Sequence, residues 1–253
     1  MKAILTNMKF ELEVIAFDLI SCQLAADNGA DRIELCANPH EGGTTPSYGM
    51  MKAARKLTPI QVFPIIRPRG GDFLYTQEEF DAMKEDIMAA QDIGCDGVVI
   101  GILNNDGTVD VEKCQELVAL AGDMEVTFHR AFDRVKDPLY SLEQIIAIGC
   151  KRVLSSGLKP TAMEGSLLLK TLVSQANGRI KIMPGSGVRA ENIIQLAKDT
   201  GASCFHSSAR KTIESPMRYL NTDMKENLVQ VSLDGTEVKH LKHNLVTHFK
   251  SMH

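Results

Sequence analysis

Eight short apolar segments alternate with amphipathic stretches along most of this chain, and no other feature restricts its possible folds as strongly. Most of the segments are apolar almost without interruption and rich in Val, Ile or Phe, as strands buried on both faces are. The segments are 12–18, 32–36, 61–67, 97–103, 125–132, 152–156, 181–185 and 203–207. Strand and crossover helix repeated eight times predict an α/β fold, the (β/α)₈ TIM barrel.

The stretches between these segments have the pattern of helices. In residues 76–93 the apolar side chains recur at helical spacing, and Thr76 with Glu79 has the pattern of a capping box. An open, doubly wound sheet is the alternative arrangement. It is disfavoured because no Gly-x-Gly-x-x-Gly motif follows the first strand.

Length and composition indicate one domain. The chain has 253 residues, of which 44% are hydrophobic and 24% charged, within the usual size range of a single α/β barrel. We therefore predict a single TIM-barrel domain over 1–253, with the barrel at about 12–210 and a C-terminal loop and helix at 211–253.

Charge and cysteine patterns exclude several classes of protein. The net charge is −4 and no basic cluster is present, so nucleic acid is not an expected partner. No apolar run approaches the roughly 20 residues of a membrane-spanning helix, and charges near the N-terminus argue against a secretory signal. Six widely spaced cysteines without a Cys-x-x-Cys motif indicate free thiols in a reducing compartment, the cytoplasm.

Polar side chains gather where the predicted strands end. In a TIM barrel, ligand and catalytic groups come from the C-terminal ends of the strands and the loops that follow. Glu13, Glu34, Arg67, His129 and Ser155 are therefore expected to meet at one mouth. Buried carboxylates need partners, and Arg67 is the expected one. The alternative is that these groups form structural ion pairs that merely fill the mouth.

Two further strand ends have the residues of an anion site. Arg67, Arg69 and Asp72 surround two glycines that let the backbone approach a ligand. Gly185 and Gly187, near the end of the seventh strand, suit the phosphate site that barrels often form after strands seven and eight. His206 and Ser207 follow in strand eight, and Met183 stands where a Schiff-base lysine would be needed, so imine chemistry is not expected.

A possible acid–base pair lies at the end of the fifth strand. His129 is a candidate general acid or base, Asp133 a carboxylate that could orient it, and Arg130 a cation between them. His206 is a second candidate for proton transfer. The alternative for each histidine is a structural side chain satisfied by the backbone or by a carboxylate.

The motifs together resemble the CutC family, which is named for copper homeostasis. They lie at 32–36, 41–47, 66–73, 126–133, 152–157 and 205–209. The resemblance implies a cytoplasmic TIM barrel, commonly a homodimer, with a proposed role in copper handling. The site residues that it carries over are Glu34, Cys36, Arg67, Arg69, Asp72, His129, Arg130, Asp133, His206 and Ser207.

One departure from the family bears on copper. Members often carry a cysteine two residues after the first-strand glutamate, but this chain has Ile15 after Glu13. Copper(I) prefers at least two thiolate or thioether ligands, and Cys36 supplies one. Copper(I) bound by Cys36 is thus one hypothesis for the cofactor.

A competing hypothesis is an enzyme or binding protein for a small anionic metabolite, phosphorylated or carboxylated. In this scheme Arg67 holds the anion, Glu34 and His129 exchange protons, and the loops at 185–187 and 206–208 hold a phosphate. Glycoside hydrolysis by Glu13 and Glu34 ranks lower. A third hypothesis, a scaffold for protein interactions, is disfavoured because a pure scaffold would place apolar side chains at the strand ends.

Overall fold

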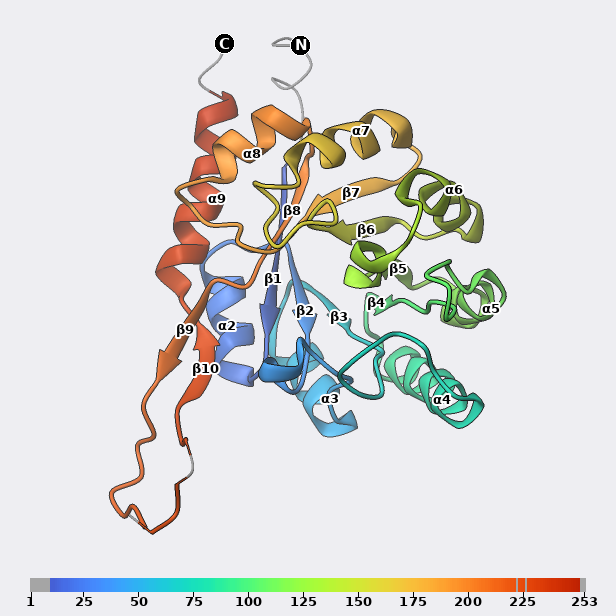
Figure 1. Cartoon of the computed structure of the whole chain (residues 1–253). Coiled ribbons are helices and arrows are strands. Elements are labelled where there is room, and N and C mark those ends of the chain that lie inside the picture. The colour runs from blue at the N-terminus through green and yellow to red at the C-terminus, as the bar shows by residue number, and fades with distance from the viewer. Residues whose placement is uncertain (1–9, 222, 226, 251–253) are drawn as a thin grey trace.

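The chain folds as an α/β TIM barrel, as the sequence predicts (Figure 1). The computed structural model describes residues 10–221, 223–225 and 227–250, so the expectation about the first nine residues lies outside the described part. The parallel strands are β1 (Glu11–Ala16), β2 (Arg32–Leu35), β3 (Gln61–Pro64), β4 (Gly97–Ile100), β5 (Glu125–Phe128), β6 (Arg152–Ser155), β7 (Lys181–Pro184) and β8 (Cys204–Ser207).

Helices follow the strands and cover the outside of the barrel (Figure 1). They are α2 (Leu19–Asp27), α3 (Tyr48–Leu57), α4 (Gln77–Ile93), α5 (Val111–Ala121), α6 (Pro138–Ile148), α7 (Ser166–Ala176), α8 (Ile193–Thr200) and α9 (Gly235–Lys250), with short 3₁₀ turns η1 (Pro39–Glu41) and η2 (Arg130–Arg134). The capping box predicted for α4 is present, because Thr76 and Glu79 each accept the other's backbone N–H. None of the described helices is long and apolar enough to cross a bilayer.

The strands form two four-stranded arcs that meet at two seams. Their orders are β3-β2-β1-β8 and β4-β5-β6-β7. At one seam Ile65 pairs with Val99 in parallel, and the N–H of Ile66 donates to the Val99 carbonyl at 2.8 Å. At the other seam β7 packs beside β8. The ring brings residues that are far apart in sequence around one interior.

Alternation along each strand separates an apolar shell from a mixed interior. Outward-facing residues such as Leu12 and Val14 on β1 and Ile33 on β2 pack in the main core, which also contains the buried side chains of the helices. Between them, Glu13 and Arg32 are equally buried but belong to an ion pair. The interior of this barrel therefore contains charged groups as well as apolar ones.

The fifth strand is shorter than predicted. The sequence suggested a strand over 125–132, but β5 ends at Phe128 and His129 caps the 3₁₀ turn η2. The reason is local: Nδ1 of His129 accepts the backbone N–H of Ala131, which turns the chain away from the sheet.

A two-stranded arm interrupts the stretch that the sequence predicted as a loop. β9 (Arg210–Ile213) and β10 (Gln230–Leu233) pair antiparallel, and the segment between them extends away from the barrel body (Figure 1). The arm returns to α9, which packs against α2 and α8. Its exposed apolar side chains lie close together in sequence, at Ile213, Met217, Tyr219, Leu220, Met224 and Leu228.

Candidate functional site

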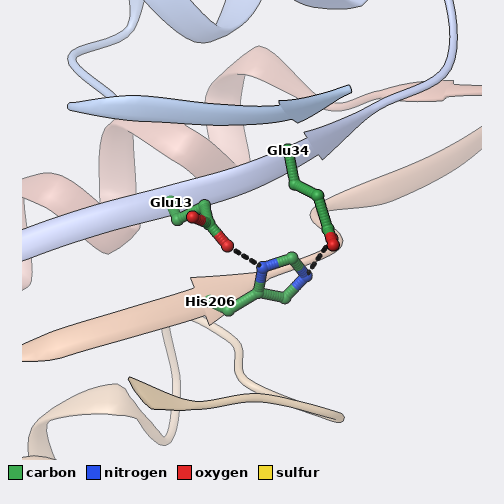
Figure 2. Close-up of side chains that lie close together, drawn as sticks. All are labelled: Glu13, Glu34 and His206. Atoms are coloured by element: carbon green, nitrogen blue, oxygen red, sulfur yellow. Dashed lines mark hydrogen bonds and ion pairs between the residues drawn. The ribbon is translucent and has the colours of Figure 1, made fainter. Parts of the chain in front are cut away.

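A row of three ionisable side chains crosses the barrel interior: Glu13 from β1, His206 from β8 and Glu34 from β2 (Figure 2). The imidazole lies between the two carboxylates. Its Nδ1 is 2.8 Å from Oε1 of Glu13, and its Nε2 is 3.8 Å from Oε2 of Glu34. We refer to Glu13, His206 and Glu34 as the proton relay.

Strand register explains why these residues meet. Glu13 is level with Arg32 on β2 and with His206 on β8. Glu34 lies two residues beyond Arg32 and so points to the same face, one layer nearer the strand end. Arg32 donates from Nε to Oε2 of Glu13 at 2.5 Å, beneath the relay.

This partner differs from the one the sequence suggested. Arg67 was expected to pair with Glu13 and Glu34, but Arg32 supplies the ion pair to Glu13. Arg32 and Glu13 are 1% and 0% exposed, which makes their attraction far stronger than that of a surface pair. The sequence signal was present, because Arg32 has the same strand parity as Glu34.

Burial and neighbouring charges give the relay groups different proton affinities. Burial alone would raise the pKa of Glu13, but the Arg32 charge and the His206 hydrogen bond outweigh it and lower the pKa to about 2. Burial raises the pKa of Glu34 to about 7, with Glu13 adding to the effect and His206 opposing it. Burial opposes protonation of His206, but its bond to Glu13 and the Glu34 charge raise its pKa above the ordinary value.

The relay opens into a cavity of about 360 Å³ at the C-terminal mouth. Its lining comes from β1, β2, β6 and β8, from β9 and from loops after the strands, and includes Ile15, Glu34, Gly42, Ile65, Arg67, Phe73, His129, Arg130, Leu154, Ser186, Gly187, His206, Ser208 and Arg210. Arg210 was not predicted. It comes from the base of the arm and lies over the ring of Phe17, a position that no strand pattern indicates.

A wider chamber of about 740 Å³ adjoins this cavity, and both share Gly42, Arg67, Phe73 and Arg130. The wider chamber also contains Glu41, Gly71, Asp72, Leu74, Leu103, Asn104, Asn105, Gly107, Asp133 and Arg134. Each of the two spaces exceeds the volume of a three- or four-carbon metabolite and falls in the range of ligand pockets.

Arg67 reaches the cavity wall but is largely occupied with the backbone. Its Nη1 donates to the carbonyls of Glu41 and Gly43 at 2.7 Å each, and its Nη2 to that of Gly71 at 2.9 Å. These bonds join two loops that border both spaces. Arg67 therefore holds the mouth in shape, and its capacity for a ligand is reduced accordingly.

Arg69 and Asp72 form a more exposed pair on the rim. Arg69 binds Asp72 at 3.0 Å and Glu79 at 2.6 Å, and hydrogen bonds to both carboxylates raise the pKa of the guanidinium. Asp72 lines the wider chamber, whereas Arg69 lines neither space. The two residues that the sequence placed in one anion site are thus in contact with each other, but only Asp72 lines a cavity.

The sequence suggested that Asp133 orients His129, but in the structure the bonds of Asp133 go to other residues. Its carboxylate accepts from the Oγ of Ser155 at 2.6 Å and from the Ser156 N–H at 2.9 Å, and it pairs with Arg130. These bonds fix the turn after β6. Ser155 is consequently buried in the support of the mouth and lines neither space.

Of the residues predicted to hold a phosphate, some line the cavity and others only support the loop. Gly187 lines the cavity, together with Ser186 and Ser208. Gly185 packs where a Cβ would lie 2.5 Å from Leu154, and Ser207 donates to the Val188 carbonyl at 2.7 Å. Gly185 and Ser207 therefore shape the loop without lining the cavity.

Comparison with known proteins gives the family. A model described as the CutC family matches residues 10–211. The chain belongs to the CutC family. Among CutC relatives, a family protein CutC from Chromobacterium violaceum is 53% identical over 208 residues, covering 82% of this chain and 84% of that protein.

Human and streptococcal proteins extend this CutC relationship, which confirms the resemblance inferred from the motifs. The copper homeostasis protein cutC homolog of Homo sapiens is 46% identical over 215 residues, covering 85% of this chain and 79% of that protein. The crystal structure of CutC from Streptococcus agalactiae is 36% identical, with a TM-score of 0.76, covering 79% of this chain and 98% of that chain.

The surroundings of Cys36 in this CutC chain are those of a core residue. Cys36 packs with Ile15, Phe63, Ile65 and Val99 inside the barrel. Burial, followed by the charge on Glu34, holds the pKa of its thiol well above the ordinary value, so the thiolate that copper(I) requires is disfavoured.

The sulfurs of Met183 and Cys204 offer no better copper site. Both lie against Nη2 of Arg32, at 3.7 and 3.4 Å, and a permanent cation there repels a metal ion.

The relay itself is the group of described residues with ligand atoms close enough for a metal, all within 4.8 Å. Its geometry is poor for that purpose. The imidazole separates the two carboxylates, and Glu13 is already paired with Arg32 and His206 (Figure 2). The arrangement suits proton transfer better than metal binding.

Proposed function

We propose that this CutC-family protein is an enzyme that moves protons on a small anionic metabolite held at the C-terminal mouth of its barrel. The observation that carries the proposal is the proton relay, which ends at a cavity with Glu34 in its wall. A carboxyl group with a pKa near 7 can accept and release a proton at neutral pH with little cost in either direction.

The relay supplies a path for this proton. Arg32 keeps Glu13 ionised, and an ionised carboxylate can only accept a hydrogen bond. Nδ1–H of His206 is therefore the donor to Glu13. The proton on Nε2 of His206, 3.8 Å from Oε2 of Glu34, is then the one that can move once the two groups approach to hydrogen-bond distance. Glu34 faces the substrate, and His206 restores its protonation state after each transfer.

Cations and loop donors support the anionic character of the ligand. Arg130 and Arg210 both line the cavity, as do Ser186, Gly187 and Ser208. Arg130 is partly neutralised by Asp133, whereas Arg210 contacts the ring of Phe17 and retains its charge for a ligand.

Replacing Arg210 with alanine tests the anion. We expect the affinity for a carboxylate or phosphate ligand to fall about tenfold or more, because a charge-assisted hydrogen bond contributes roughly 1.5–3 kcal/mol. Native mass spectrometry identifies the ligands retained on purified protein, and thermal shift with inorganic phosphate and with those ligands measures the loss.

Lys211→Ala is the matched control, since Lys211 is exposed on the same strand and lines neither space. It should bind as the unchanged protein does. If no anion is retained and none raises the melting temperature, the proposed ligand class is wrong.

Copper(I) binding at Cys36, the other function that the sequence suggests, lacks comparable support. Its thiol is 1% exposed and burial raises the pKa of that thiol, while the sulfurs of Met183 and Cys204 both lie against Arg32. The name of the human relative concerns copper homeostasis, and a proton-transfer enzyme can belong to such a system without binding the metal.

We further propose that the enzyme works in the cytoplasm as a homodimer. All six cysteines are free, which suits a reducing compartment and can be checked by cell fractionation. The exposed apolar side chains of the arm suit burial against a second copy.

Tyr219→Ser combined with Leu220→Ser tests the homodimer. These side chains are 75% and 57% exposed, so the double variant should fold normally but shift from dimer to monomer in sedimentation velocity. Leu167→Ser on α7, which is 79% exposed and distant from the arm, should stay dimeric (Figure 1). If the wild-type protein sediments as a monomer, the proposed homodimer is wrong.

A further inference from the structure

His129 has a fixed tautomer that leaves one donor unused. Its Nδ1 accepts the backbone N–H of Ala131 at 3.1 Å, so the ring hydrogen resides on Nε2. The side chain is 3% exposed, and Nε2 has no hydrogen-bond partner within the described part of the chain. Buried donors without partners are rare in folded proteins and call for an explanation.

Packing holds the His129 ring firmly at the wall of the cavity. A Cβ at Gly101 would lie 2.4 Å from both Nδ1 and Cε1, so that edge of the ring is closed by the backbone of Gly101. The ring of Phe73 covers His129 with centroids 4.9 Å apart. His129 as a residue lines the 360 Å³ cavity, and its Nε2 is buried without a partner beside that space.

The imidazole is neutral at any working pH. Burial, and then the charge of Arg67, lower the pKa of His129 to about 3. With Nδ1 occupied and Nε2 protonated, His129 has no lone pair to offer as a general base. This differs from the proton-exchange role that the sequence suggested, and it leaves His129 as a hydrogen-bond donor.

We propose that Nε2–H of His129 binds the carbonyl oxygen of the substrate, and that the substrate is an anionic aldehyde or ketone with a hydrogen on the carbon next to the carbonyl. This inference rests on the proposed function, because it assigns the base to Glu34 in the same cavity. A neutral imidazole that donates to a carbonyl stabilises the enolate as negative charge develops on oxygen.

The reaction step balances without a cofactor. The Glu34 carboxylate takes the proton from the α-carbon, the electrons of that C–H bond form the carbon–carbon double bond, and the carbonyl π electrons move to the oxygen. The oxygen is held by Nε2–H of His129. Return of the proton to the same or the neighbouring carbon gives exchange or isomerisation, while Arg210 and Arg130 hold the anionic group.

Deuterium exchange measures this step directly. The protein is incubated in D₂O with pyruvate, 2-oxoglutarate, dihydroxyacetone phosphate and glyceraldehyde 3-phosphate, and proton NMR follows the loss of the α-hydrogen signal. We expect exchange with at least one probe. His129→Phe should slow it about 100- to 1000-fold, the usual effect of removing one oxyanion donor, and His129→Gln, which keeps an N–H donor, should recover part of the rate.

Controls separate this inference from the proposed function. His240→Phe, an exposed histidine on α9, should exchange at the unchanged rate. If Glu34→Gln abolishes exchange but His129→Phe does not, His129 is not the donor and the proposed function stands. Absence of exchange with all four probes overturns the assignment of a carbonyl substrate. The proposed function is then tested separately, by the pH dependence of stability for Glu34 and by the anion affinity for Arg210.

Discussion

Replacing Arg32 with methionine will lower the free energy of unfolding by about 3–5 kcal/mol, because it leaves a buried carboxylate without its cation. Glu13 is fully buried, and Arg32 is its close ionic partner below the relay. Methionine retains much of the volume beside Phe63, so the loss comes mainly from the charge. Urea unfolding followed by circular dichroism measures it.

A surface pair supplies the matched control for this loss. Arg179 and Glu143 pair through two hydrogen bonds, but both are more than 40% exposed. Arg179→Met should therefore cost far less stability than Arg32→Met. Adding Glu13→Gln to Arg32→Met should restore part of the stability, since it removes the uncompensated charge. A loss below about 1 kcal/mol in Arg32→Met would mean that water reaches Glu13 and screens it.

The sequence allowed the barrel to be predicted because its signal is periodic. Eight apolar segments with helices between them have few ways to bury their surfaces, and strand parity then places the relay residues Glu13, Glu34 and His206 near one mouth. Those parts of the site follow from the pattern of single strands.

Pairing within the site could not be predicted in the same way. Arg32 and Arg67 are both plausible partners for Glu13 by composition, and only the register between β1 and β2 selects Arg32. Side-chain direction decides the rest: the Ala131 N–H fixes the ring of His129, and Asp133 turns to β6 instead. Arg210 enters the cavity from an arm that has no periodic signal, so tertiary structure alone reveals it.

Glu34→Gln should reduce the rate of proton transfer about 100- to 10,000-fold, the range for loss of a general acid–base group. In the unchanged protein kcat/KM should rise as the pH passes about 7, because Glu34 must lose its proton to act as a base. The variant should lack this rise. Glu164→Gln, an exposed carboxylate after β6, should behave as the unchanged protein.

The same variant has an effect on stability that requires no substrate. Between pH 4.5 and about 7, Glu34 is ionised in the unfolded chain but holds its proton in the folded one. The folded state therefore binds more protons, and the unchanged protein loses stability as the pH rises, by at most about 1.4 kcal/mol per pH unit. The raised pKa of His206 acts in the same direction above its ordinary value of 6.5.

Glu34→Gln should flatten this part of the stability profile. Glutamine cannot ionise, and without the Glu34 charge the pKa of His206 loses one of the causes that raise it. Urea unfolding at pH values from 5 to 8 compares the two proteins, which should differ in slope and not merely in height. Parallel profiles would show that Glu34 titrates as an ordinary carboxyl group, and the relay would then have no proton to exchange at neutral pH.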